Sequence, residues 1–183
     1  MRCRVEAAPL RAEPRDDAEQ VTQALRGDLL DVAESKDGWT RVMTAYGYPG
    51  WLREEALEEG PGSLPAPCDG DPVEVARSYL GAPYEWGGLT TAGIDCSGLV
   101  HIAYRLAGRQ IPRDSWQQEE AGTPVEAPER GDLVTYGGDR ADHIAFWLGE
   151  GRILHATAKD GLGVTEEPEP AELRARRRRV VRM

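Results

Sequence analysis

Cys96 is the first residue whose type and position could support a catalytic role. The glycine-rich stretch before it ends in Asp95, and an apolar pattern of helical period begins directly after it. The apolar positions of this pattern are Leu99, Val100 and Ala103, with Tyr104 and Ala107 widening the face. Because Asp95 suits an N-cap and Gly108 a C-cap, we predict a helix of about three turns that starts at Cys96.

A thiol in the first turn of a helix lies near the positive end of the helix dipole. This position favours the thiolate, which is the nucleophilic form. A small buried hydrophobic role would also explain a free cysteine. The pattern around Cys96 allows both interpretations, and the histidines of the chain decide between them.

Two histidines belong to a predicted β-hairpin that turns at Gly149-Glu-Gly151. If the turn uses these three residues, His143 lies opposite Thr157 and His155 lies opposite Ala145. The two imidazoles then share one face as diagonal neighbours. A shift by one residue would place them on opposite faces, so this prediction depends on the turn length.

Thiol catalysis needs a base within hydrogen-bond reach of the sulfur and a third group that holds the ring of the base. We therefore predict Cys96 as nucleophile, His143 as base and His155 as the orienting group. Two half-buried sheet histidines without a catalytic role are the alternative. His101 lies about 140° around the helix from Cys96, so we expect it to be structural or on the surface.

The composition argues against several classes of function. A formal net charge of −10 argues against general nucleic-acid binding, which needs a basic surface. A hydrophobic content of 40%, without a run of about 18 apolar residues, predicts a soluble globular chain that does not bind membranes. Cys3, Cys68 and Cys96 lack CxxC spacing, so we expect no metal site, disulfide framework or other cofactor. The first residues contain no apolar signal segment, which predicts a cytoplasmic protein unless a leader has been removed.

The arginine-rich end of the chain, residues 174–183, allows two interpretations. One is a basic tail for nucleic acid or anionic lipid. We favour the other, a last and partly exposed strand with Val180 and Val181 as its apolar part. The surplus of acidic residues elsewhere in the chain can neutralise these arginines.

The chain divides by composition into three segments. Residues 1–58 contain short apolar patches separated by turn residues and no helical period, which predicts a small all-β barrel. Residues 59–70 are rich in proline and glycine and are predicted to be an extended linker. Residues 71–183 hold the Cys96 helix and the hairpin and are predicted to form the second domain.

Both predicted domains resemble known families. Residues 46–52, Tyr-Gly-Tyr-Pro-Gly-Trp-Leu, resemble the closing signature of bacterial SH3-like domains. The second domain resembles the NlpC-type cell-wall cysteine peptidases. The motifs that carry this second resemblance are Tyr84-x-Trp-Gly-Gly, Asp95-Cys-Ser-Gly-Leu-Val, Pro112-Arg-Asp-Ser, Gly131-Asp-Leu-Val, His143-Ile-Ala-x-x-Leu-Gly and Ile153-Leu-His-Ala.

The second resemblance implies an α+β domain with a papain-like core, in which the Cys96 helix packs on an antiparallel sheet. It also implies Cys96 as nucleophile, His143 as base and His155 as the polar third member. Tyr84 would lie beside the oxyanion site. The residues expected along the substrate cleft are Trp86, Asp95, Ser97, Asp114 and Ser115.

An SH3-like domain before such a core is similar to the subgroup that cleaves γ-D-glutamyl-diamino acid bonds in free wall peptides. In that subgroup the SH3-like domain closes one end of the cleft, so that only a stem peptide with a free N-terminal L-alanine fits. Tyr48 matches the aromatic residue of that wall, and Glu19 is expected to supply a carboxylate for the amine. This chain is shorter than we would expect for that subgroup, which often carries an additional SH3-like unit, and this difference leaves the substrate length open.

The sequence thus predicts a cysteine endopeptidase that acts on peptidoglycan stem peptides in cell-wall recycling, through an acyl-enzyme at the γ-D-glutamyl carbonyl. We expect a monomer. One alternative is an amidase or acyltransferase on the same papain-like core. Another is a module that binds wall fragments with little activity. The sequence does not predict which diamino acid is preferred.

Overall fold

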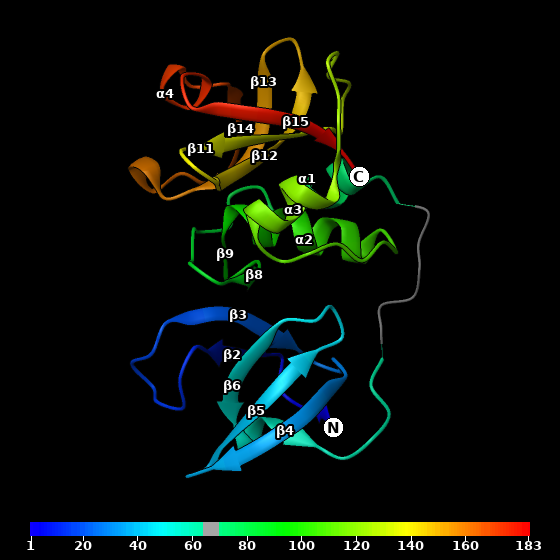
Figure 1. Ribbon diagram of the computed structural model, residues 1–183, viewed down its shortest axis with the longest axis vertical. Coiled ribbons are helices and arrows are strands. Elements are labelled where there is room, and N and C mark those ends of the chain that lie inside the picture. The colour runs from blue at the N-terminus through cyan, green and yellow to red at the C-terminus, as the bar shows by residue number, and fades with distance from the viewer. Residues whose placement is uncertain (64–69) are drawn as a thin grey trace.

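The computed structural model describes residues 1–63 and 70–183. Figure 1 shows three layers: a β-barrel built from the first part of the chain, a layer of helices, and a second sheet beyond them. Half of the predicted linker over residues 59–70, including Cys68, lies outside the described residues.

The first domain is all-β, as predicted, with Leu10, Leu30, Val42 and Leu52 buried in its core. Its main sheet has the strand order β3-β2-β6-β5-β4, and β1 pairs with β7 beside it. The strands are β1 Arg2–Cys3, β2 Ala7–Arg11, β3 Gln20–Leu25, β4 Leu30–Lys36, β5 Trp39–Thr44, β6 Pro49–Arg53 and β7 Leu57–Glu58, with a 3-10 turn, η1, at Glu54–Ala56.

The second domain is α+β, with a six-stranded antiparallel sheet of order β10-β15-β11-β12-β13-β14. Its strands are β8 Leu89–Thr90, β9 Gly93–Ile94, β10 Thr123–Pro124, β11 Leu133–Gly137, β12 Ala141–Gly149, β13 Arg152–Thr157, β14 Gly163–Pro168 and β15 Arg177–Arg182. Its helices are α1 Pro72–Arg77, α2 Cys96–Leu106, α3 Ser115–Ala121 and α4 Ala171–Arg174, with a 3-10 turn, η2, at Lys159–Gly161. None of the helices in residues 1–63 and 70–183 is long and apolar enough to cross a membrane.

Helix α2 begins at Cys96, as its capping signals predict. The Asp95 carboxylate accepts a hydrogen bond of 2.6 Å from the backbone N–H of Gly98, which satisfies one free donor of the first turn. The helix ends at Leu106, and Gly108 adopts a φ of 79° just beyond it. The apolar face of α2 packs against the side of the sheet that carries Ile144, Phe146, Leu154 and Ala156.

The β12–β13 hairpin has the predicted register, although its turn differs from the expected one. Phe146 pairs with Leu154 and Trp147 pairs with Ile153, which continues toward His143 opposite Thr157. The turn itself has two residues, at positions 150 and 151, and both adopt positive φ. A bulge between Trp147 and Gly149 adds one residue to β12. The residues of β12 before the bulge therefore have the register expected for a three-residue turn.

The arginine-rich end forms strand β15, which confirms the strand interpretation. Val181 is buried in the core, and the arginines pair with acidic residues of neighbouring elements. These pairs are Arg177 with Glu169, Arg178 with Glu119, and Arg182 with Asp132 and Glu129.

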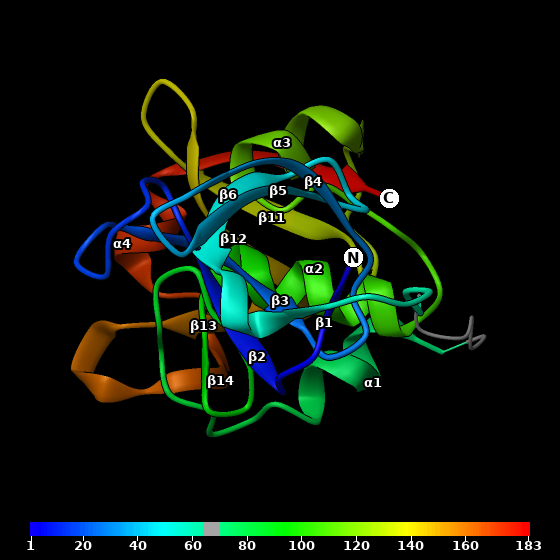
Figure 2. The same ribbon diagram turned by 90° about the horizontal axis from the view of Figure 1, so that it is seen from below.

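The barrel lies against the helical layer, and in the view from below its strands lie in front of α2 (Figure 2). Asp28 of the barrel forms a buried ion pair with Arg105 of α2. The Tyr46 ring lies 4.4 Å, centroid to centroid, from the imidazole of His101. His101 is fully buried at this interface and hydrogen bonds to the carbonyl of Ile111, so its role is structural rather than on the surface.

Candidate active site

Cys96 lies in the first turn of α2 and only 6% of its surface is exposed. The backbone N–H groups of Ser97 and Ile144 lie close enough to its sulfur to lower the pKa of the thiol. Ile144 is the residue after His143 on β12. Cys96 therefore lies near the strand that carries the base candidate, where the N-terminus of α2 approaches β12.

The Cys96 thiol is neutral at rest. Burial, followed by the negative charge of Asp95, raises the pKa of this thiol to about 12. The N–H groups of Ile144 and Ser97 and the charge of Arg113 lower the pKa, but by less. Burial therefore acts against the thiolate, the form that the helix dipole is expected to favour.

His143 and His155 form a hydrogen-bonded pair, with His143 Nε2 and His155 Nδ1 2.8 Å apart. Burial, followed by the neighbouring His155, lowers the pKa of His143 to about 3. Burial also lowers the pKa of His155, which is 2% exposed. Near neutral pH His143 is an uncharged imidazole, the form that can accept a proton.

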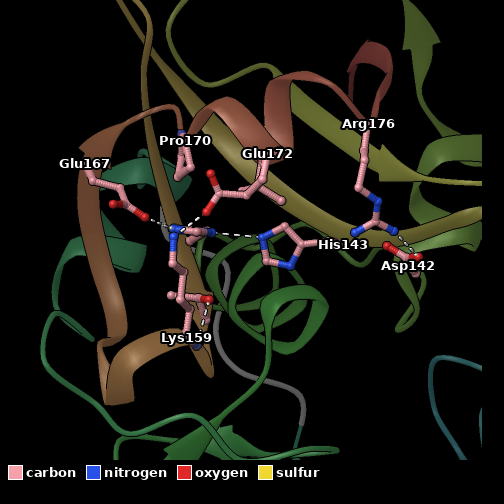
Figure 3. Close-up of a pocket in the computed structure, with 10 residues that line it drawn as sticks. Asp142, His143, Lys159, Glu167, Pro170, Glu172 and Arg176 are labelled. Carbon is pink, nitrogen blue, oxygen red and sulfur yellow. Dashed lines mark hydrogen bonds and ion pairs between the residues drawn. The ribbon is translucent and has the colours of Figure 1, made fainter.

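A fourth residue extends this chain of hydrogen bonds. Glu167 Oε1 on β14 lies 3.0 Å from His155 Nε2, and a dashed line starts from each of the labelled side chains His143 and Glu167 in Figure 3. The sequence analysis did not identify Glu167, which lies in an acidic stretch, Glu166-Glu-Pro-Glu169, without a motif. The pairing of β14 with β13 in the sheet is what brings Glu167 next to His155.

Asp95 is held by more donors than a helix cap needs. Its carboxylate accepts from the backbone N–H of Gly87 at 2.7 Å, in addition to Gly98. Arg113, 1% exposed, binds both of its oxygens at 3.0 and 2.8 Å. Arg113 Nε also donates to Thr22 Oγ1 of the barrel at 3.1 Å. Asp95 therefore positions the Cys96 turn, and Arg113, whose role the sequence analysis missed, links this turn to the first domain.

A cleft with a cavity volume of about 370 Å³ opens over Cys96 between the two domains. Seven of the predicted cleft residues line it: Glu19, Tyr48, Trp86, Asp95, Ser97, Asp114 and Ser115. Five residues that the sequence analysis did not identify also line it: Val21, Trp116, Arg140, Ala141 and Asp142.

The barrel forms one wall of this cleft. The Tyr48 hydroxyl donates to the two carboxylate oxygens of Asp114 at 3.0 and 3.2 Å. Burial raises the pKa of Asp114, and burial together with this carboxylate raises the pKa of Tyr48. Glu19 accepts a hydrogen bond of 2.8 Å from Trp86 Nε1. Two carboxylates, each hydrogen bonded to an aromatic side chain, thus line the cleft.

Barrel residues also hold the loop that carries Trp86, whose surface is 59% exposed. The Gln20 side chain donates to the Trp86 carbonyl at 2.8 Å and to Glu85 at 3.0 Å. The Gln23 side chain accepts from the backbone N–H of Leu89 at 2.9 Å. The shape of the cleft therefore depends on contacts between the two domains.

Three predicted site residues do not line this cleft. Tyr84 is half-buried, and its pKa is raised by burial and then by electrostatic interaction with Cys96. His143 and His155 line a second hollow of about 300 Å³, and Asp142 borders both hollows. In the part of the chain that the structure describes, no cluster of three or more histidine, cysteine or acidic side chains could hold a metal ion.

The fold and this arrangement define a class of protein: an SH3-like barrel followed by a papain-like α+β domain with a cysteine at a helix N-terminus and histidines on the sheet. The NlpC/P60 family model matches residues 81–175, and the chain belongs to this family. A model described as a bacterial dipeptidyl-peptidase Sh3 domain matches residues 10–57.

Several known proteins are similar to this chain. A γ-D-glutamyl-L-lysine dipeptidyl-peptidase of Bacillus cereus is 32% identical over 63% of this chain and 37% of its own. The peptidoglycan endopeptidase RipB of Mycobacterium tuberculosis is 40% identical over 49% of this chain and 43% of its own. The chain thus spans less than half of the length of either relative. The crystal structure of an NlpC/P60 family protein from Bacillus cereus superposes with a TM-score of 0.59 at 26% identity, covering 98% of this chain and 61% of the other.

Proposed function

We propose that this protein is a cysteine endopeptidase that cleaves the bond between γ-D-glutamate and a diamino acid in stem peptides with a free N-terminal L-alanine. One observation carries the proposal: Cys96 opens into a cleft that Glu19 and Tyr48 of the barrel line together with Asp114 of the second domain. The names of the relatives support the substrate class.

The neutral resting state of Cys96 and His143 indicates general-base catalysis. His143 removes the thiol proton as the sulfur attacks the γ-carbonyl carbon, which avoids a free thiolate in a buried site. Tyr84, beside the sulfur, stabilises the oxyanion that forms. The imidazolium then returns the proton to the leaving amine, and water hydrolyses the γ-glutamyl thioester with His143 acting again as base.

The charges along the cleft fit such a peptide from end to end. The ammonium group of L-alanine carries a positive charge and pairs with Asp114 and Glu19. The α-carboxylate of D-glutamate is not part of the γ-linked chain and needs a cation. Arg140 lines the cleft, and in the described part of the chain it forms no ion pair. Arg113, the other nearby guanidinium, is buried against Asp95 and is not free to bind substrate.

The proposal is tested by incubating the protein with L-Ala-γ-D-Glu-diaminopimelate and identifying the products by mass spectrometry, with Cys96→Ala as control. Release of L-Ala-D-Glu by the wild type alone supports the proposal. Hydrolysis of a different amide bond, or transfer of the acyl group to an added amine, would indicate an amidase or an acyltransferase. Binding without turnover would indicate a wall-binding module. A parallel incubation with intact sacculi should release little, because the barrel closes the cleft.

A further inference from the structure

We infer that Glu167 is a positioning residue that sets the proton positions of both site histidines. The inference rests on the proposed function of Cys96 and His143, and it adds a fourth member to their hydrogen-bond chain. Glu167 touches neither Cys96 nor the cleft. It acts through His155, whose Nε2 lies 3.0 Å from its carboxylate.

The hydrogen bonds determine which nitrogen of each ring carries a proton. His143 Nε2 contacts His155 Nδ1 at 2.8 Å, so Nδ1 is the nitrogen of His143 that remains for the thiol. To accept a proton there, His143 must carry its own proton on Nε2 and donate it to His155. His155 must then accept on Nδ1 and carry its proton on Nε2.

The carboxylate of Glu167 favours this state, because an ionised carboxylate accepts hydrogen bonds and cannot donate one. Without an acceptor at Nε2, His155 could carry its proton on Nδ1 and donate it to His143. The proton of His143 would then move to Nδ1, and the base would be lost. The negative charge of Glu167 also stabilises, through His155, the imidazolium that forms on His143.

The sheet brings Glu167 to this place. Glu167 pairs with Ile153 and His155 pairs with Thr165, so the two side chains are diagonal neighbours on one face of β13 and β14. The preceding residue, Glu166, faces the other side of the sheet and pairs with Arg77 at 2.6 Å. The side chain of Glu167 is 27% exposed and that of Glu166 is 22% exposed. Glu166 is therefore a control of the same residue type and similar exposure.

Other charged groups near His155 are already paired. Lys159 of η2 pairs with Glu172 of α4, and Arg176 pairs with Asp142 of β12 at 2.6 Å. All four line the same hollow as Glu167, as Figure 3 shows. The charges within each of these two pairs offset one another. Glu167 is the acidic side chain of this hollow that forms a hydrogen bond with His155.

The test compares Glu167→Ala and Glu167→Gln with Glu166→Ala and Glu166→Gln. Nitrogen NMR of histidine-labelled protein reports the proton on each ring nitrogen, independently of substrate. In the wild type and both Glu166 variants, His143 and His155 should both be protonated on Nε2. In Glu167→Ala part of the population should move to Nδ1. Glu167→Gln keeps an acceptor oxygen of the same reach and should retain the wild-type pattern, which also guards against a misfolded alanine variant.

Kinetics give the second readout. On the tripeptide, kcat of Glu167→Ala should fall about 10- to 100-fold with KM unchanged, and Glu167→Gln should recover part of the loss. Unchanged histidine tautomers in Glu167→Ala would overturn the inference, as would equal losses in the Glu166 variants. If the wild type does not cleave the tripeptide, the proposed function fails, and the NMR comparison still decides the role of Glu167.

Discussion

The two hollows that meet at Asp142 are built in different ways. The cleft over Cys96 needs both domains: its walls come from Glu19 and Tyr48 of the barrel and from Asp114 of the second domain. The histidine chain needs one sheet, because His143, His155 and Glu167 lie on three adjacent strands. Under the proposed function, the histidine chain that serves the chemical step lies within the second domain, whereas the surfaces that would choose the substrate come from both domains.

Loss of the nucleophile should have the largest effect. Cys96→Ala should lower kcat/KM by at least about 1,000-fold, because no other group can form the acyl-enzyme. The fold should be unaffected, since the substitution removes one buried atom that lines an open cleft. Circular dichroism checks that the fold is unchanged, and a hydrolysis assay measures the loss of kcat/KM. Retention of more than a small fraction of activity would exclude Cys96 as nucleophile.

The pH dependence of thiol alkylation tests the neutral resting state. A thiol with a raised pKa of about 12 stays protonated across neutral pH, so its thiolate fraction grows about tenfold per pH unit. Alkylation of Cys96 by iodoacetamide, followed on its own peptide by mass spectrometry, should therefore rise steadily from pH 5 to pH 9. A plateau below pH 7 would instead show a preformed thiolate–imidazolium pair.

Changes at His155 should reduce the chemical step within an intact cleft. His155→Ala should lower kcat by about 100-fold and change KM little, because the residue acts on His143 and lines no part of the substrate cleft. His155→Asn and His155→Gln should keep more activity, since an amide oxygen can accept from His143 Nε2. Equal losses in all three variants would contradict an orienting role.

Blocking the substrate amine tests whether the cleft between the two domains recognises that amine. N-acetylation of the tripeptide should lower kcat/KM of the wild type by about 5- to 150-fold, the equivalent of about 1–3 kcal/mol for an unpaired buried partner. The penalty should be smaller in Tyr48→Ala, where Asp114 has lost its partner and the wall is open. Tyr48→Phe loses the hydroxyl and keeps the ring. It therefore separates the loss of the hydrogen bond to Asp114 from the opening of the cleft wall. Strictly additive effects would show that the barrel does not recognise the amine.

The smallest effect is expected at the exposed side chain of Arg140. Arg140→Ala should raise KM by about 2- to 5-fold for a substrate with a free α-carboxylate on D-glutamate, in line with a solvent-exposed ion pair. A substrate with this carboxylate amidated should show no such change. An equal rise in KM for both substrates would mean that Arg140 supports the cleft through its contact with the Trp116 ring and does not bind the carboxylate.

Local signals made part of this site predictable. The start of α2 follows from Asp95 and its helical period, and both depend on neighbouring residues. The shared face of His143 and His155 follows from the length of the connection at Gly149, even though the structure divides it into a bulge and a shorter turn.

The parts that escaped prediction depend on distant residues. Glu167 joins the histidines because β14 pairs with β13, and no motif surrounds it. Arg113 lies in a recognised motif, but its position between Asp95 and Thr22 requires both domains. The raised pKa of Cys96 reflects burial by the whole fold, which no local pattern of residues shows.

Trapping the acyl-enzyme tests the central claim most directly. The protein is mixed with excess L-Ala-γ-D-Glu-diaminopimelate, quenched in acid within the first turnover, digested and mapped by mass spectrometry. We predict that the L-Ala-γ-D-glutamyl group is attached as a thioester to the peptide that contains Cys96, and that His143→Ala shows none. Turnover that proceeds with the group on another residue, or with no covalent intermediate in the wild type, would contradict the account.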